Sequence, residues 1–424
     1  MRIEVMKIRE QLENLVQKET ILAQEIAPYR MILHSPFRSL PDDVLEVIFL
    51  ACLPNDHIPV IDFRQPPLLL TQISSHLRRV AFGTPRLWTA IDVPILAPCL
   101  TQWFDGRDDS RICYAKRTMA KYAWAVDQWL RRTGACDIEI FIHEKGNHIA
   151  SCYVEEIFQL LIKRVPQWKS ISFHCSAYSI QHFCYMLGQS SFKEFQEFKF
   201  PRLKHLSLDI SGEYLQQDDP QQEYNYISHL PDAFRLNSIH LVVPADNYEG
   251  YCIHWSRITY LSLGNASYPS SLNSIVKILE LCSGLLSCKL YIKMDNTIIR
   301  LCLPHLRDIS IAFDQEAWFG DSKIYGNAFY TLQMKKAFSI FDRLGLPTLK
   351  RITYDASTEF MPLLGLIHRM DNRITHLSVT NFEVPTELME CLKACPLLVA
   401  LDVSLHRPLP LCYGPLLETN FFAI

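Results

Sequence analysis

The chain has 424 residues, of which 49% are apolar and 21% are charged, and its formal net charge is −3. This composition is typical of a folded protein with a large core and excludes a disordered tail. The small net charge gives no electrostatic reason to expect nucleic acid or an anionic membrane as a partner. No apolar run reaches the roughly 18 residues of a membrane helix, and the charged N-terminus lacks a signal-peptide pattern. We therefore expect an intracellular protein, in the cytoplasm or the nucleus.

Residue types that carry chemistry are present without the patterns that usually organise them. The fourteen cysteines are scattered, and no two of them form a CxxC pair. In a reducing compartment they indicate small buried apolar residues rather than disulfides or zinc ligands. The chain has only 14 glycines and contains no Walker-type loop, no GxGxxG and no GxSxG elbow. We expect no catalytic residue, no metal and no cofactor.

Residues 1–27 carry a heptad pattern. Apolar side chains recur in steps of four and three, with Glu19 as the one interruption, at Met1, Val5, Ile8, Leu12, Leu15, Leu22 and Ile26. The pattern predicts a helix that ends before Pro28. A seam this short makes a marginal free coiled coil, so we expect it to pack on the following domain, with pairing to another helix as the alternative.

The next segment, SPFRSLPDDVLEVIFLACLP (35–54), predicts a short helix with a prepared start. Pro41 suits the first helical turn, Ser39 with Asp42 loosely fits a capping box, and Asp42 and Asp43 complement the helix dipole. The helix then presents a broad apolar face made of Val44, Leu45, Ile48, Phe49, Cys52 and Leu53. A second helix is predicted with one apolar side, made of Leu70, Ile73, Leu77 and Val80. A unit of about sixty residues cannot bury this much apolar surface in itself, which indicates a partner.

From about residue 125 onward one short pattern repeats. Its form is P-x-L-x-x-L-x-L, a strand with alternating apolar positions introduced by a proline or aromatic turn. It appears as DIEIFI (137–142), WKSISFHC (168–175), FPRLKHLSLDI (200–210), LNSIHLVV (236–243), WSRITYLSLGN (255–265), LPHLRDISIAF (303–313), LPTLKRITYDA (346–356), RITHLSV (373–379) and CPLLVALDV (395–403). Helix-like stretches such as VEEIFQLLIKRV lie between these strands. A strand followed by a helix every 20 to 45 residues or so is typical of a leucine-rich-repeat-type solenoid.

The stretch SLPDDVLEVIFLACLP, with the later PPLLLTQISSHLRRVAFGTPRLWTAIDV, resembles the F-box-like domain at the head of many proteins from mushroom-forming fungi. Those proteins also tend to open with a short heptad helix and to continue into degenerate leucine-rich repeats. The residues that fit the F-box pattern are Leu40, Pro41, Asp43, Leu45, Ile48, Phe49, Ile73, Arg78, Arg79, Val80 and TPRLW ending at Trp88. The chain departs from the family at Leu77, where tryptophan is common.

The resemblance implies an α/β protein of three parts: a heptad helix and linker (1–35), an F-box-like domain (36–95) and a degenerate leucine-rich-repeat solenoid (96–424). It also implies that the F-box docks on the Skp-family adaptor of a cullin ubiquitin ligase, while the solenoid holds a protein substrate. The chain itself would then not be an enzyme. The residues expected at the adaptor are Leu40, Pro41, Val44, Leu45, Ile48, Phe49, Leu70, Ile73, Leu77 and Trp88.

Each predicted strand also gives candidate substrate-binding residues. The leucine-type positions should face the core, so the positions between them should face the open side of the sheet. These positions are His205, Ser207, Asp209, Tyr260, Ser262, Asp308, Ser310, His376, Ser378, Asp402 and Ser404. Their mixed polar character suits a protein or peptide partner better than nucleic acid or lipid.

Two other classes of function stay open. The chain could be an interaction scaffold or ligand sensor without a role in ubiquitin transfer. It could also be an uncharacterised hydrolase or metal enzyme, for which HEKGNH (His143, Glu144, His148) is the nearest motif. The two histidines there are one residue too far apart for the metalloprotease pattern, and the segment more simply indicates a polar turn after a strand.

Overall fold

The computed structural model describes residues 2–33, 40–96, 109–145, 154–189, 200–210, 233–243, 248, 251, 253–293, 301–313, 344–355, 363–369, 373–380 and 385–404. The chain divides into two compact units, unit 1 (Met1–Trp88) and unit 2 (Thr89–Ile424). Unit 1 is helical, and unit 2 combines helices with a large parallel sheet. The predicted α/β class is therefore confirmed.

Unit 1 consists of α1 (Arg2–Leu33), α2 (Asp42–Ala51), α3 (Leu70–Ile73), α4 (Ser75–Gly83) and the 3-10 helix η2 (Pro85–Trp88). The prediction that the first helix ends before Pro28 is wrong, because α1 continues through it to Leu33. A proline removes one backbone donor from a helix, and the remaining hydrogen bonds can still carry the helix past it. The heptad side chains Ile8, Leu12, Leu15 and Leu22 are exposed. Whether these side chains pack on the following domain, as expected, or pair with another helix stays a prediction.

The second apolar segment of unit 1 is divided where one helix was expected. Ser74 has an extended backbone between α3 and α4, and its Oγ accepts a hydrogen bond from the backbone N–H of Leu77 at 3.2 Å. Serine prefers this N-cap position because its oxygen satisfies an otherwise unpaired N–H. The break turns Ile73 outward, whereas Leu70, Leu77 and Val80 stay buried.

In the described part of unit 2 the sheet has twelve strands, eleven of which are neighbours in the order β1-β2-β3-β4-β5-β6-β8-β10-β12-β13-β14. Every pairing is parallel. These strands are β1 (Ala90–Leu96), β2 (Ile138–Lys145), β3 (Trp168–His174), β4 (His205–Asp209), β5 (Ser238–Val242), β6 (Tyr260–Leu263), β8 (Ser287–Lys293), β10 (Asp308–Phe313), β12 (Arg351–Asp355), β13 (His376–Thr380) and β14 (Ala400–Ser404). The short β7 (Ser270–Ser271) pairs with β8, and β9 (Leu301–Cys302) pairs with β11 (Leu344–Gly345) in a second sheet. Each neighbour in the large sheet is thus the next main strand along the chain.

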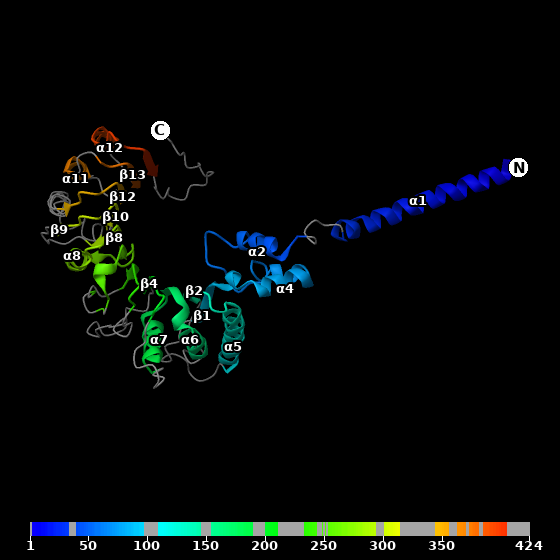
Figure 1. Ribbon diagram of the computed structural model, residues 1–424, viewed down its shortest axis with the longest axis horizontal. Coiled ribbons are helices and arrows are strands. Elements are labelled where there is room, and N and C mark those ends of the chain that lie inside the picture. The colour runs from blue at the N-terminus through cyan, green and yellow to red at the C-terminus, as the bar shows by residue number, and fades with distance from the viewer. Residues whose placement is uncertain are drawn as a thin grey trace. The chain divides into compact units, whose positions relative to one another are not determined.

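The described helices of unit 2 alternate with some of the strands along the chain and lie on one side of the sheet (Figure 1). They are α5 (Asp109–Arg132), α6 (Glu155–Ile162), α7 (Ala177–Gln189), α8 (Leu272–Leu281), α11 (Leu363–Arg369) and α12 (Pro385–Lys393), with the short η5 (Val165–Gln167) and η8 (Trp255–Arg257). The alternating leucine-type residues of the strands are buried toward this side, as in Leu206 and Leu208 of β4. Aromatic side chains pack between β3 and the helices on this side of the sheet, where the ring centroids of Phe183 and Phe158 are 5.0 Å apart. The opposite side of the sheet, which we call the open face, carries the intervening residues.

All nine repeated segments contain a strand of this sheet. The repeated pattern did not predict β8, where Cys288 stands at the position that leucine or isoleucine takes in most of the other strands. The sheet also begins earlier than expected, since β1 lies in the last residues assigned to the F-box-like domain and pairs with β2. None of the helices that the structure describes is both long enough and apolar enough to cross a membrane.

Candidate functional site

Helix α2 has two apolar faces. Leu45 and Phe49 are buried on one of them. Val44, Val47 and Ala51 are exposed on the other and Ile48 is half-buried beside them, at the spacing of three and four residues that puts side chains on one helix face. We call Val44, Val47, Ile48 and Ala51 the apolar arc of α2. A surface helix normally presents polar residues on its outer face, so this arc is suited to a further contact.

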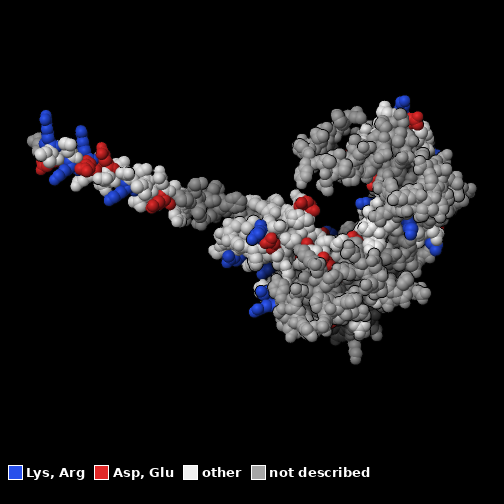
Figure 2. Space-filling view, turned by 180° about the vertical axis from the view of Figure 1, so that it is seen from behind, with Lys and Arg blue, Asp and Glu red and all other residues white. Residues whose placement is uncertain are grey.

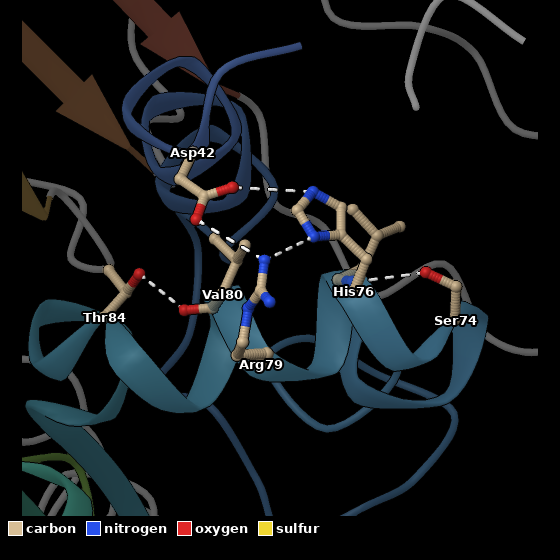
Figure 3. Close-up of polar contacts among 7 residues, drawn as sticks. Asp42, Ser74, His76, Arg79, Val80 and Thr84 are labelled. Carbon is tan, nitrogen blue, oxygen red and sulfur yellow. Dashed lines mark hydrogen bonds and ion pairs between the residues drawn. The ribbon is translucent and has the colours of Figure 1, made fainter. Parts of the chain in front are cut away.

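Polar contacts hold the start of α2 against α4 (Figure 3). Asp42 Oδ1 lies 3.5 Å from His76 Nε2, and Asp42 Oδ2 lies 3.9 Å from Arg79 Nη2. Arg79 Nη2 also donates to His76 Nδ1 at 3.0 Å. These groups are largely exposed, so each pair stabilises the unit by less than about 1 kcal/mol. Asp42 therefore helps to orient α2, and buried apolar contacts supply most of the stability. Helix α2 itself begins with Pro41 at the N-cap and no side-chain cap, and Ser39 of the expected capping box lies outside the described residues.

The predicted adaptor residues fall into two groups in the structure. Those that are exposed or half-buried are Leu40, Pro41, Val44, Ile48 and Ile73. Those that are buried are Leu45, Phe49, Leu70, Leu77 and Trp88. Trp88, for example, donates from Nε1 to the carbonyl of Ala81 at 2.9 Å within unit 1. A side chain in the core of a folded unit offers no surface to a partner, so the second group explains the fold of unit 1 and the first group is what a partner can reach. Sequence reasoning missed Val47, which its position three residues after Val44 indicates.

On unit 2, the strand register puts all the predicted substrate residues on the open face. Three rows run across the strands there. The first row includes His205, Tyr260, Asp308 and His376, the second includes Ser207, Ser262, Ser310, Ser378 and Asp402, and the third includes Asp209 and Ser404. The exposure of the Ser404 side chain lies outside the description. Their placement on one face follows from the period of two along each strand.

Several of these residues already contact one another. Ser262 is buried, and its Oγ lies 2.7 Å from His240 Nδ1. Ser378 Oγ donates to Asp402 Oδ2 at 3.3 Å. Such cross-strand pairs fix the side chains before any partner arrives, which lowers the entropy cost of binding.

The histidines in the middle of the open face are biased toward the neutral form. Burial lowers the pKa of His205, and the positive charge of Lys169 lowers it further. Burial also lowers the pKa of His240, against the opposing effect of Asp209, and Lys289 adds to the lowering. On the side of the molecule in Figure 2, charges of both signs are interspersed among the described residues, without a broad area of one sign.

The hypothesis of a hydrolase or metal enzyme rested on the HEKGNH segment, and the structure gives its Glu144 a different role. Glu144 accepts from the backbone N–H of Ser176 at 2.9 Å and also contacts the hydroxyls of Ser176 and Ser179 at the start of α7. His148 lies outside the described residues. Burial raises the pKa of the Cys175 thiol and raises that of Cys184 to about 12, which disfavours the reactive thiolate at both. Among the residues that the structure describes, no group of three or more His, Cys, Asp or Glu side chains is placed to hold a metal ion.

No protein-family model matches this chain, and none of the curated proteins matches it either. Arguments about its function therefore rest on its own residues and their arrangement.

Proposed function

We propose that the chain is the substrate-recognition subunit of a Skp–cullin–F-box ubiquitin ligase. In this proposal unit 1 docks on the Skp-family adaptor, and the open face of unit 2 binds a protein substrate. The observation that carries the proposal is the apolar arc of α2, because its helix is anchored in the core by Leu45 and Phe49 and still presents an apolar outer face. A helix of this form is what helix-in-groove recognition requires.

The arrangement of unit 2 supports the second half of the proposal. Parallel strands in chain order, with the described helices on one side of the sheet, are the arrangement of a leucine-rich-repeat-type solenoid. The same hydrogen bond also begins several strands. The backbone N–H of the first residue of β8, β10 and β12 donates to a backbone carbonyl at 3.0 to 3.1 Å, and that carbonyl belongs to the residue just before the preceding strand of the sheet. The result is an extended face of mixed polar side chains, which suits a protein partner.

The protein would carry out no bond-making step under this proposal. Its contribution would be to hold a substrate close to a catalytic centre on a partner protein, which raises the effective concentration of the substrate there. This division of labour needs two separate binding surfaces, one apolar and one polar. The apolar arc and the open face meet that requirement.

The test compares two valine-to-aspartate variants of the full chain. Val47 on the arc is 67% exposed and Val399, just before β14, is 64% exposed, so both variants should fold. An aspartate at Val47 would carry an unpaired charge into a desolvated contact and should cost at least about 2 kcal/mol, or roughly thirtyfold in affinity. We expect the Val47→Asp variant to lose co-purification with a Skp-family adaptor and the Val399→Asp variant to retain it.

Two results would count against the proposal. If the unaltered chain captures no Skp-family adaptor, the scaffold or ligand-sensor alternative is preferred. If the adaptor binds and the Val47→Asp variant binds equally well, the arc is not the docking surface. Circular dichroism of both variants shows whether a loss of binding reflects unfolding.

A further inference from the structure

Four consecutive strands of unit 2 carry, in order, an acid, two histidines and a second acid. Asp92 lies on β1, His143 on β2, His174 on β3 and Asp209 on β4. His143 and His174 are direct register partners, and so are His174 and Asp209. Register partners on neighbouring strands are about 4.8 Å apart and point to the same face. The two imidazoles therefore stand side by side on the open face.

Each histidine is engaged by the acid on its outer side. His143 Nδ1 lies 2.7 Å from Asp92 Oδ1, and both side chains are mostly buried. His174 Nδ1 is hydrogen-bonded to Asp209 Oδ2 at 2.9 Å, where the histidine is half exposed. The first contact is close but lacks the alignment of a hydrogen bond. In both cases Nδ1 is turned away from the other histidine.

The covalent geometry of imidazole then fixes where the second nitrogen lies. Nδ1 is on one edge of the ring, and Nε2 is on the edge that carries Cδ2. Because the Nδ1 atoms of His143 and His174 face outward toward β1 and β4, their Nε2 edges face the space between β2 and β3. The hydrogen bond between His174 Nδ1 and Asp209 also favours the tautomer of His174 with the proton on Nδ1, which leaves a lone pair on Nε2. In both rings the contact to the carboxylate uses Nδ1 and not Nε2.

We propose that His143 and His174 form a two-imidazole site for a divalent transition-metal ion such as Zn²⁺. The two Nε2 atoms are the ligands, and Asp92 and Asp209 orient the rings from the second layer. Carboxylate–histidine–metal arrangements of this kind are usual in metalloproteins. Water, or a side chain of a bound partner, completes the tetrahedral coordination that zinc prefers.

The number of ligands sets what this site can do. Two protein ligands are fewer than the three of a catalytic zinc site, in keeping with the lack of any three-residue group placed for a metal among the described residues. Positions left open on the ion can accept a carboxylate or an imidazole from a protein that lies on the open face. The site thus gives the polar face a metal-dependent anchor, and it does not depend on the role proposed for unit 1.

The alternative is that the four residues form two separate His–Asp pairs that only hold neighbouring strands together. Titration of the metal-free full chain with ZnCl₂, followed by calorimetry, separates the two readings. In the proposal, His143→Gln and His174→Ala each weaken the same binding event by at least tenfold. Asp92→Asn and Asp209→Asn weaken it 10- to 100-fold, as is typical for residues that orient metal-bound histidines. MgCl₂ gives no such event, because Mg²⁺ prefers oxygen ligands.

The matched control is His205→Ala, on the same face of β4 and outside the pair, which should bind Zn²⁺ as the unaltered chain does. His174 is half exposed, so its replacement should leave the fold intact and makes its variant the decisive one. Zinc binding by His174→Ala with unchanged affinity and stoichiometry overturns the proposal. Equal loss in His174→Ala and His205→Ala overturns it as well, because the effect would then not belong to the pair.

Discussion

The two candidate binding surfaces of this protein differ in chemistry. The outer face of α2 in unit 1 is apolar, with Val44 and Val47 exposed. The open face of unit 2 is polar, and many of its side chains are paired with one another, as in His240 with Ser262 and Ser378 with Asp402. Binding at the outer face of α2 would be stabilised by the removal of apolar surface from water. The open face of unit 2 instead offers hydrogen-bonding groups and charges in fixed positions.

Under the proposed function, the two surfaces would bind two kinds of partner. Apolar contacts are insensitive to salt and tolerate little variation in shape, which suits one constant partner. Polar contacts give specificity, because an unmatched buried hydrogen-bonding group costs free energy. A receptor with one invariant partner and one selected partner would be expected to divide its surfaces in this way. The predictions below test whether the division holds.

The largest effect should separate the inner and outer faces of α2. Leu45 is completely buried, so Leu45→Asp puts an uncompensated charge in the core and should lower the free energy of unfolding of unit 1 by several kcal/mol. Val44→Asp, one residue earlier and exposed, should change it by less than about 0.5 kcal/mol. Urea denaturation followed by circular dichroism measures both. Equal destabilisation by the two variants would show that α2 has no outer face.

A second comparison uses the cysteines of the two units. Cys52, at the end of α2, is exposed, whereas Cys184 in α7 is buried against the sheet and burial raises its pKa to about 12. At pH 8 the thiolate of such a group is about a thousandfold rarer than that of an ordinary thiol. Iodoacetamide should therefore modify Cys52 rapidly and Cys184 very slowly, as followed by peptide mass spectrometry. In urea the two rates should become similar, and fast native labelling of Cys184 would contradict the packing of α7.

A smaller effect should come from the break between α3 and α4. The Ser74 hydroxyl accepts from the N–H of Leu77, and Ser74→Ala removes this cap at a cost of about 1 kcal/mol. The matched control is Ser75→Ala, because the neighbouring Ser75 is exposed inside α4 and alanine favours helix. Thermal melting should show a lower midpoint for the first variant only. If both variants melt alike, the cap does not hold the start of α4.

Most of the fold follows from local patterns, and most of the candidate sites do not. The repeat in segments such as LPTLKRITYDA predicted β12 because a period of two is a property of the strand itself. The outer and inner faces of α2 could not be separated in the same way, since Val44 and Leu45 are equally apolar and only packing decides which is buried.

The histidine pair shows the same limit more clearly. The sequence puts His143 beside Glu144 and His148, but the register brings it to His174, which lies on the next strand. That pairing depends on where each strand enters the sheet and on the irregularity between Ile138 and Glu139, which moves β3 by one residue relative to β2. A one-residue shift moves side chains to the opposite face, so local sequence alone cannot specify which polar residues meet.

The smallest predicted effect concerns pH and the open face. The pKa of His240 is lowered in the folded protein mainly by burial; Asp209 opposes this shift and Lys289 adds to it. The unfolded chain therefore takes up a proton at this residue first, at its ordinary pKa of about 6.5. The contribution of His240 to stability is fully present above that pH and is lost as the pH falls from about 6.5 toward the lower folded pKa.

His240→Gln should reduce the slope of the free energy of unfolding between pH 7 and pH 5, measured by urea denaturation. An unchanged slope in His240→Gln would mean that this histidine is as well solvated as in the unfolded chain, and that the polar face is more open to water than its packing indicates.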